Sequence, residues 1–160
     1  MKVILLNGKI GAGKSYIGSN LHYSLNNSAY IEGDSFLQIN PFVPTEENYN
    51  LVAHSIANQV KTYAKFKTLD YVVISWVIWY EETFNILKKE LEKFEFLPIC
   101  LKCPLAELRK RVKEDIENKK RWPDNLKKTS RKIWSEGFTN INSNQSLEKI
   151  LNDITNLINN

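Results

Sequence analysis

A glycine-rich octapeptide close to the amino terminus constrains the fold of this chain more than any other feature. Residues 8–15 read Gly-Lys-Ile-Gly-Ala-Gly-Lys-Ser and match the pattern G-x-x-x-x-G-K-[ST] at each fixed position. The apolar residues 3–6 precede the loop, and a helix-like run, residues 15–25, follows it. This succession of strand, glycine loop and helix is the context in which the pattern forms a phosphate-binding loop. An incidental glycine-rich turn is the alternative interpretation, and the two flanking segments argue against it.

The chemistry of the loop predicts a site for a nucleoside triphosphate. Glycines have no Cβ, so backbone amides can crowd around a pyrophosphate, and the amino end of the following helix adds free N–H donors and a partial positive charge. We expect Lys14 to reach the β- and γ-phosphates and the Ser15 hydroxyl to hold Mg²⁺. ATP and Mg²⁺ are therefore the expected cofactors, and the expected nucleotide-binding residues are Gly8, Lys9, Ile10, Gly11, Ala12, Gly13, Lys14 and Ser15.

Apolar patterning along the rest of the chain predicts strands that alternate with helices. Continuous or β-branched apolar runs indicate strands at residues 3–6, 29–32, 71–75, 96–101 and 138–141, and helical spacing indicates helices at residues 15–25, 46–65, 84–94, 104–116 and 147–158. Such alternation is typical of a parallel sheet with helices on both faces. Ligands of these sheets bind beyond the carboxyl ends of the strands, so functional residues should follow directly after them. A chain of 160 residues is expected to form one domain, residues 1–160.

Composition and charge narrow the classes of function. The apolar and charged fractions, 42% and 25%, are ordinary for a soluble globular protein, and no apolar run suits a secretory signal or a membrane span. We therefore expect a cytoplasmic protein without a membrane partner. Residues 102–132 hold twelve Lys or Arg against five Asp or Glu, an excess that fits phosphate handling, weak nucleic-acid attraction or simply a solvated helix.

The two cysteines, Cys100 and Cys103, are spaced C-x-x-C. A structural zinc site needs four ligands, and neither His22 nor His54 lies near the pair in the sequence. The pair also straddles the end of an expected strand and the start of an expected helix, unlike a redox C-x-x-C, which opens a helix. We expect buried or helix-capping thiols without metal or redox use.

Two shorter motifs follow the loop along the chain. Residues 33–36 form G-D-x-F at the end of the second expected strand, and residues 103–111 form C-P-x-x-x-L-x-x-R before the basic segment. With the loop, they resemble the small P-loop kinases, namely the adenylate-, shikimate- and gluconate-kinase-like group and the chloramphenicol phosphotransferase-like enzymes, over essentially the whole chain. The resemblance implies a P-loop NTPase fold, a three-layer α/β/α sandwich with a five-stranded parallel sheet, and a short mobile lid at about residues 118–132.

The resemblance also implies a catalytic role for Asp34. In related kinases an aspartate at this strand end accepts the proton of the acceptor hydroxyl or helps to order Mg²⁺, so Asp34 is expected to act as base or as a metal-organising residue beside Ser15. Many P-loop proteins carry a further aspartate at the end of the third strand, where this chain has Ser75. A simple turn cap after Gly33 is the alternative role for Asp34.

The basic segment supplies cations for the equatorial oxygens of a transferring phosphoryl group. Similar kinases use lid arginines in an R-x-x-x-R pattern, but Asp115 stands where the second arginine after Arg111 would fall, and Arg121 is the expected replacement. The expected catalytic residues are therefore Lys14, Asp34, Arg111 and Arg121, with Arg109 and Lys120 as further candidates that are alternatively only solvated.

Aromatic residues gather after two of the expected strands and predict the nature of the acceptor. Their rings could stack on a planar compound, which favours a nucleoside, nucleotide or aromatic drug over a small sugar, while core packing is an equally good explanation. These residues are Phe36, Phe42, Trp76, Trp79 and Tyr80.

The predicted function is ATP-dependent phosphoryl transfer to a small acceptor, a nucleoside, nucleotide or similar ring compound, by a monomer or homodimer. Nucleic acid is not expected as a partner. Two alternatives stay open. A nucleotide-binding module that transfers no phosphate would fit the missing third-strand aspartate, and a polynucleotide 5′-hydroxyl kinase would fit the basic segment and an isoelectric point near 9.0.

Overall fold

The glycine-rich loop follows the central strand of one parallel sheet. The computed structural model describes residues 1–159 and places five strands in the order β2-β3-β1-β4-β5, all parallel. Their bounds are β1 (Lys2–Gly8), β2 (Ser28–Glu32), β3 (Tyr71–Ser75), β4 (Glu95–Lys102) and β5 (Thr139–Asn142). Leu6 of β1 pairs with Ser75 on one side and with Ile99 on the other. The predicted five-stranded parallel sheet is confirmed.

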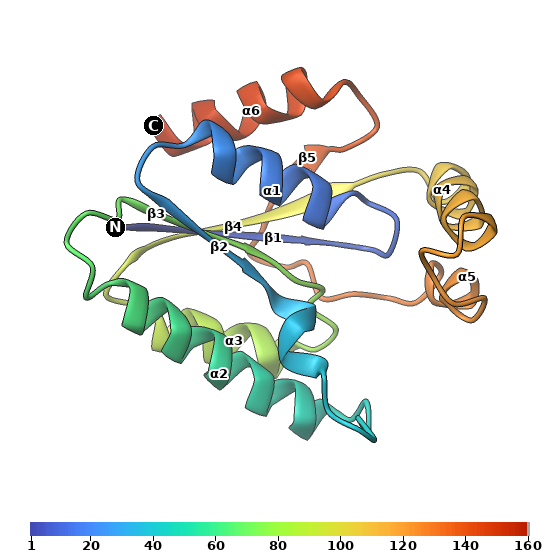
Figure 1. Ribbon diagram of the computed structural model, residues 1–160, viewed down its shortest axis with the longest axis horizontal. Helices are drawn as coiled ribbons and strands as arrows, with labels where there is room; N and C mark the ends of the chain where they lie inside the picture. The colour runs from blue at the N-terminus through green and yellow to red at the C-terminus, as the bar shows by residue number, and fades with distance from the viewer. Residues whose placement is uncertain (160) are drawn as a thin grey trace.

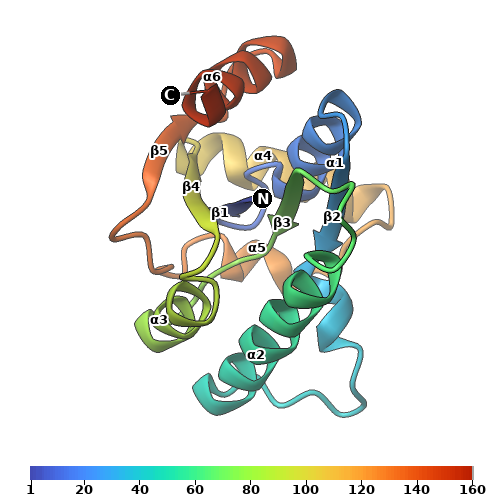
Figure 2. The ribbon, with the colours of Figure 1, turned by 90° about the vertical axis from the view of Figure 1, so that its left-hand side faces the viewer.

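Helices cover both faces of the sheet, and two more lie beyond its carboxyl edge (Figure 1). α1 (Lys14–Ser24) and α6 (Leu147–Asn159) lie on one face, and α2 (Glu46–Tyr63) and α3 (Glu81–Glu90) lie on the other, as Figure 2 shows end-on. α4 (Leu105–Glu117) and the short α5 (Asn125–Lys128) lie past the strand ends. The three-layer α/β/α sandwich is therefore confirmed. Among residues 1–159, no helix combines the length and the apolar character needed to cross a membrane.

The apolar patterning of β1 explains why both faces of the sheet need cover. Its residues Val3, Ile4, Leu5 and Leu6 are completely buried, and successive side chains of a strand point to opposite faces. Val3 and Leu5 pack in the core with α2 and α3, whereas Ile4 and Leu6 pack in the core with α1 and α6. Burial stabilises by roughly 1.5–3 kcal/mol per side chain of this kind. A continuous apolar strand is therefore stable only between two helical layers.

The chain after β2 differs from the prediction. Apolar patterning assigns no helix between residues 32 and 46, yet Gly33–Leu37 form a 3₁₀-helix, η1. A Cβ at Gly33 would lie 2.4 Å from Cγ of the Trp76 indole, so only glycine allows η1 to pack directly on that ring. η1 thereby holds Asp34 beside the carboxyl ends of the strands.

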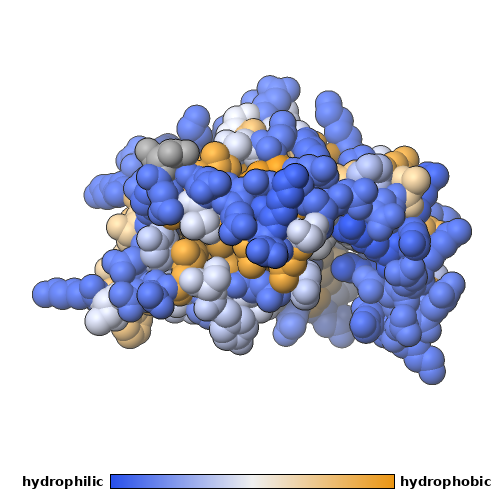
Figure 3. Space-filling model, turned by 90° about the horizontal axis from the view of Figure 1, so that it is seen from above, coloured by the Kyte–Doolittle hydropathy of each residue, from blue (hydrophilic) through white to orange (hydrophobic). Residues whose placement is uncertain are grey.

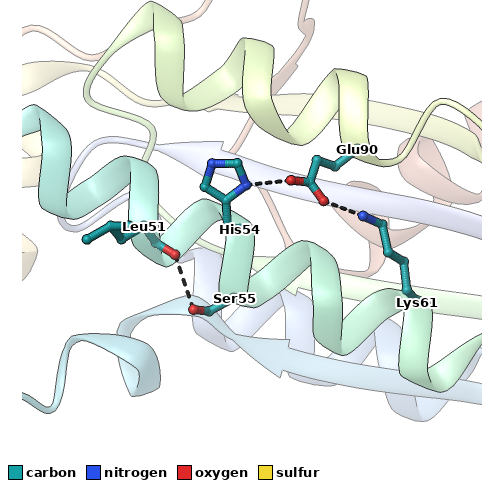
Figure 4. A network of polar contacts seen from close by, with 5 residues as sticks. All are labelled: Leu51, His54, Ser55, Lys61 and Glu90. Carbon is teal, nitrogen blue, oxygen red and sulfur yellow. Dashed lines mark hydrogen bonds and ion pairs between the residues drawn. The ribbon is translucent and has the colours of Figure 1, made fainter.

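A polar network links the two helices on one face (Figure 4). The Glu90 carboxylate at the end of α3 accepts hydrogen bonds from Nδ1 of His54 and Nζ of Lys61, both on α2. In the same stretch of α2, the Ser55 hydroxyl donates to the Leu51 carbonyl at 3.1 Å. The hydrogen bonds from Lys61 and then His54 lower the pKa of the Glu90 carboxyl. The network ties α3 to α2 outside the apolar core.

The basic segment is less uniform than its sequence indicates. The helix α5 forms within residues 118–132, although patterning predicts none there. Trp122 is 79% exposed, whereas Ile133 and Trp134 pack against the core. The end of the molecule that carries α4 and α5 is mostly hydrophilic (Figure 3). The segment is thus anchored at its carboxyl end and largely solvated at its tip.

Both cysteines are free thiols in the structure. Cys100 is buried in β4, Cys103 is half-buried after it, and burial raises the pKa of each thiol. Across the part of the chain that the structure describes, no three His, Cys, Asp or Glu side chains gather as a metal cluster.

Candidate active site

A cavity of about 730 Å³ opens at the carboxyl edge of the sheet. The phosphate loop and the first turn of α1 form its floor, and the segments after β2 and β3 form one wall. α4, the basic segment and the segment after β5 form the other walls. Because the strand order is β2-β3-β1-β4-β5, the loop after β1 lies in the middle of the cavity. The segments after β2 and β3 lie on one side of it, and those after β4 and β5 lie on the other. The lining residues used below are Lys14, Asp34, Tyr49, Trp79, Arg111, Arg121, Lys128, Arg131, Ser143 and Gln145.

The backbone of the phosphate loop needs its glycines. Gly11 and Gly13 have φ values of 87° and 88°, a left-handed region that other residues rarely adopt. A Cβ at Gly11 would also lie 3.0 Å from the Leu108 carbonyl oxygen of α4. The loop therefore takes its shape from local glycine geometry and from close contact with α4.

The Lys14 ammonium folds back over its own loop. Nζ donates to the Gly8 carbonyl at 2.8 Å and to the Lys9 carbonyl at 3.3 Å. Burial lowers the pKa of Lys14 to about 8, with the Asp34 carboxylate opposing that shift and the Arg121 guanidinium adding to it. Both hydrogen-bond partners of this ammonium are neutral carbonyl groups. The charged oxygens of a phosphate group would therefore attract it more strongly.

Ser75, at the position of the missing third-strand aspartate, supports the loop. Its side chain is completely buried, and the hydroxyl donates to the Lys14 carbonyl at 2.9 Å. A Cβ on Gly18 would lie only 2.2 Å from this oxygen, so the glycine allows α1 to approach β3 closely. Ser75 fixes the first turn of α1 against β3.

Asp34 lies on η1 and lines the cavity with an exposed side chain. The structure therefore brings it to the same cavity as Lys14. Glu32, the last residue of β2, accepts a hydrogen bond from the Tyr30 hydroxyl at 2.6 Å and does not line the cavity. Burial, and after it the hydrogen bond to Glu32, raises the pKa of Tyr30. Of these two carboxylates near the end of β2, Asp34 is the one that lines the cavity.

The structure separates the four predicted cations into two groups. Arg111 and Arg121 line the cavity, whereas Arg109 and Lys120 do not. Arg111 contacts Glu107 through Nε at 3.1 Å and Asn144 through Nη2 at 3.1 Å. Arg121 pairs with Asp115 at 2.7 Å. Arg109 instead donates to the Ser130 hydroxyl at 3.0 Å, outside the cavity.

Of the two explanations for the aromatic residues after the strands, core packing accounts for most of them. Trp76 is 1% exposed and belongs to the core, where its ring centroid lies 6.2 Å from that of Tyr49. Phe36 and Phe42 also pack against that core and do not line the cavity. Among the five predicted aromatic residues, Trp79 lines the cavity, whereas Phe36, Phe42 and Tyr80 are partly buried against the core.

Sequence reasoning missed several lining residues. Ser143 follows β5 directly, so the strand-end rule could have found it. Tyr49 lies in the first turns of α2, and Arg131 lies at the end of a segment crowded with cations. Nothing in their local sequence distinguishes them from core and solvated residues. Their role depends on packing.

Comparison with protein families places the chain in a known class. Residues 4–134 match the model of a family described as AAA domain. The match spans most of the chain, so the chain belongs to this family. Its P-loop, sheet order and helical layers are those of the small P-loop kinase fold that the sequence motifs resemble. A comparison with curated protein sequences gave no significant match.

Several solved structures share the fold at low identity. An APS kinase from Mycobacterium tuberculosis, in complex with AMPPNP and APS, superposes with a TM-score of 0.78 at 13% identity, covering 99% of this chain and 98% of that one. A gluconokinase from Sinorhizobium meliloti 1021 gives 0.73 at 16% identity, covering 95% and 88%. The tunicamycin resistance protein of Deinococcus radiodurans gives 0.65 at 17% identity, covering 98% and 95%. These likenesses show the fold and leave the substrate open.

Proposed function

We propose that this protein is a kinase that transfers the γ-phosphoryl group of ATP to a small acceptor of nucleoside, nucleotide or similar ring type. The observation that carries the proposal is the joint placement in one cavity of Lys14 from the phosphate loop, Asp34 from η1 and cations from the basic segment. The kinases among the structurally similar proteins support the same class of reaction. Phosphoryl transfer chiefly requires positioning of the two reactants and electrostatic stabilisation of the transferring phosphoryl group. A cavity with these residues would supply both.

The nucleotide is assigned to the loop and to the β4–β5 side of the cavity. Lys14 and the loop amides would bind the phosphates, and Arg111, Ser143 and Gln145 line the side where the rest of the nucleotide would lie. Arg121 would approach the γ-phosphoryl group from the basic segment. We propose that residues 1–160 form one kinase domain, with residues 118–132 as its lid.

The acceptor is assigned to the opposite, β2–β3 side, because that side carries Asp34. As the acceptor oxygen bonds to the γ-phosphorus, the bond from that phosphorus to the bridging oxygen of ADP breaks, and Asp34 takes the hydroxyl proton. Proton transfer of this kind contributes typically about 10²–10⁴-fold. The cavity offers the oxygen donors that Mg²⁺ prefers, the Ser15 hydroxyl and the Asp34 carboxylate. When bound, Mg²⁺ would neutralise charge on the phosphate oxygens.

The test combines nucleotide binding with an acceptor screen. The protein is titrated with Mg²⁺ and AMPPNP, then incubated with labelled ATP and a panel of nucleosides, nucleotides, sugars, sugar acids and antibiotics. We expect nucleotide binding that Lys14→Ala abolishes, and transfer that Asp34→Asn lowers by about 100-fold or more. Asp70→Asn is the matched control, because Asp70 directly precedes β3, at the opposite end of that strand from the cavity, and its carboxylate accepts a hydrogen bond from Asn27. Nucleotide binding without transfer to any acceptor would contradict the proposal.

A nucleotide-binding module without transfer is the second candidate. Ser75 favours it, because the hydroxyl is committed to the Lys14 carbonyl where many P-loop proteins have an aspartate. Asp34→Asn separates the two functions: a module keeps all its activity, and a kinase loses transfer while still binding nucleotide.

A polynucleotide kinase is favoured by one observation, the exposed Trp122 directly after the basic run 119–121. Exposed aromatic rings beside cations can stack on unpaired bases. Oligonucleotide binding that weakens steeply with salt would support this function. Binding that Trp122→Ala leaves unchanged would argue against it.

A further inference from the structure

An arginine without a carboxylate partner lies on the acceptor side of the cavity. Cζ of Arg131 lies 4.3 Å from the centroid of the Trp79 ring, and Nη2 donates to the Tyr80 hydroxyl at 3.0 Å. Tyr49 and Asp34 line the same cavity as Arg131. Within residues 1–159, Arg131 forms no ion pair.

The other four basic side chains that line the cavity each have a carboxylate or carbonyl partner for their positive charge. Three of them pair with carboxylates, and the fourth is held by carbonyl oxygens of its own loop. The pairs are Arg111 with Glu107 at 3.1 Å, Arg121 with Asp115 at 2.7 Å and Lys128 with Asp124 at 2.6 Å, and the loop-bound residue is Lys14. Arg131 differs because an aromatic face and a neutral hydroxyl hold it in place.

This support fixes the guanidinium without neutralising it. A ring face and a hydroxyl position the planar group, and a guanidinium has five N–H donors, most of which these contacts leave free. The same geometry covers a face of the Trp79 indole, the one predicted aromatic residue that lines the cavity. A planar acceptor cannot stack on that face while Arg131 occupies it. Recognition at this wall therefore depends on charge more than on stacking.

Resting on the proposed function, we infer that the acceptor carries an anionic oxygen group, a phosphate, sulfate or carboxylate, that binds Arg131. A guanidinium matches such groups with two parallel hydrogen bonds. Asp34 and Arg131 both act electrostatically on Tyr49: burial raises the pKa of Tyr49, Arg131 opposes the rise and Asp34 adds to it. An acceptor held by its anion at Arg131 would present its hydroxyl toward Asp34, which orients it for attack.

The test measures binding separately from transfer. Protein saturated with Mg²⁺ and AMPPNP is titrated calorimetrically with two matched pairs: a nucleoside and its 5′-monophosphate, and glucose and gluconate. The pairs distinguish a phosphate from a carboxylate. We expect at least one anionic member to bind about tenfold or more tightly than its neutral partner. Arg131→Gln should remove that preference, and Arg131→Lys should keep part of it, because lysine retains the charge and loses the planar fork.

Lys132→Gln is the matched control. It removes one positive charge from the neighbouring residue, and Lys132 lines a separate cavity with Lys9 and Ser135. Equal affinity for both members of each pair, or a preference that survives in Arg131→Gln, would overturn the inference. Transfer from labelled ATP to the same compounds, measured in separate mixtures without AMPPNP, reports on the proposed function by itself. Arg131-dependent binding of an anion without transfer would overturn the kinase and support the anion site.

Discussion

The side-chain amide of Asn7 joins the phosphate loop to the end of the basic segment. Its Nδ2 donates to the Trp134 carbonyl at 2.7 Å, although 127 residues separate the two. Its Oδ1 accepts from the Gly8 amide at 2.8 Å and from the Ile78 amide at 3.0 Å. Trp134 and Ile78 are also joined directly by a backbone hydrogen bond of 2.9 Å. One buried amide thus connects the phosphate loop, the segment after β3 that carries Trp79, and the end of the basic segment that carries Arg131.

Replacement of Asn7 by alanine should destabilise the protein by about 2–4 kcal/mol, because it leaves several buried backbone groups without a partner. Urea unfolding measures the loss. Asn58→Ala, on the exposed face of α2, is the matched control and should change stability little. Equal stability of Asn7→Ala and the wild type would show that water satisfies the freed groups.

Gly18→Ala should also destabilise, by about 1–3 kcal/mol, despite the better helix propensity of alanine. The new Cβ would overlap the Ser75 hydroxyl at 2.2 Å and crowd Cε2 of Tyr30 at 2.9 Å. The double variant Gly18→Ala/Ser75→Ala removes the closer of these two contacts. It should therefore recover part of the loss relative to the sum of the single variants, as a double-mutant cycle would show. Strict additivity would contradict a direct contact.

Nucleotide affinity should fall as the pH rises above neutrality. Burial lowers the pKa of Lys14 to about 8, so the free protein loses the ammonium charge as the pH passes through that value. Phosphate binding favours the charged form, and linkage then predicts about tenfold weaker AMPPNP binding at pH 9 than at pH 7. Calorimetric titration across this range measures it. Lys14→Ala should bind weakly with a nearly flat profile, and a steep fall in that variant would assign the titration to another group.

Stability should depend on Glu90 only above mildly acidic pH. Its pKa is lowered in the folded protein by hydrogen bonds from Lys61 and His54. A lowered carboxyl pKa stabilises the fold above the unfolded value, and the stabilisation is lost as the pH falls through the folded value. Glu90→Gln should cost up to about 1 kcal/mol at pH 7, and the difference should vanish well below pH 4.5. Thermal unfolding checks this, with the exposed Glu92→Gln as the control.

The proposed lid, residues 118–132, should gain protection when nucleotide binds. Most of its side chains are exposed, so its local stability is low without ligand. Bound phosphate should attract its cations, and closure would exclude water from the transfer step. Hydrogen exchange with and without Mg²⁺ and AMPPNP measures this, with α6 as the segment that should not change. Equal protection in both states would mean that the contacts of Ile133 and Trp134 already hold the segment closed.

The sequence by itself was sufficient to predict the phosphate loop and the parallel sheet. The loop depends on glycine dihedrals and on the helix that follows, both of which are local properties. The apolar run of β1 requires cover on both faces, which implies a parallel sheet between helices. Asp34 could be located for the same reason, because ligands of such sheets bind where strands end.

Only the tertiary structure decided which side chains share the cavity. Trp76 and Trp79 lie three residues apart after the same strand, yet one is in the core and the other lines the cavity. Arg109 on α4 and Arg131 in the basic segment are both cations, yet Arg131 lines the cavity and Arg109 does not. Burial and proximity across many residues arise from packing between distant segments, as with Asn7 and Trp134. Local patterning carries no information about such pairs.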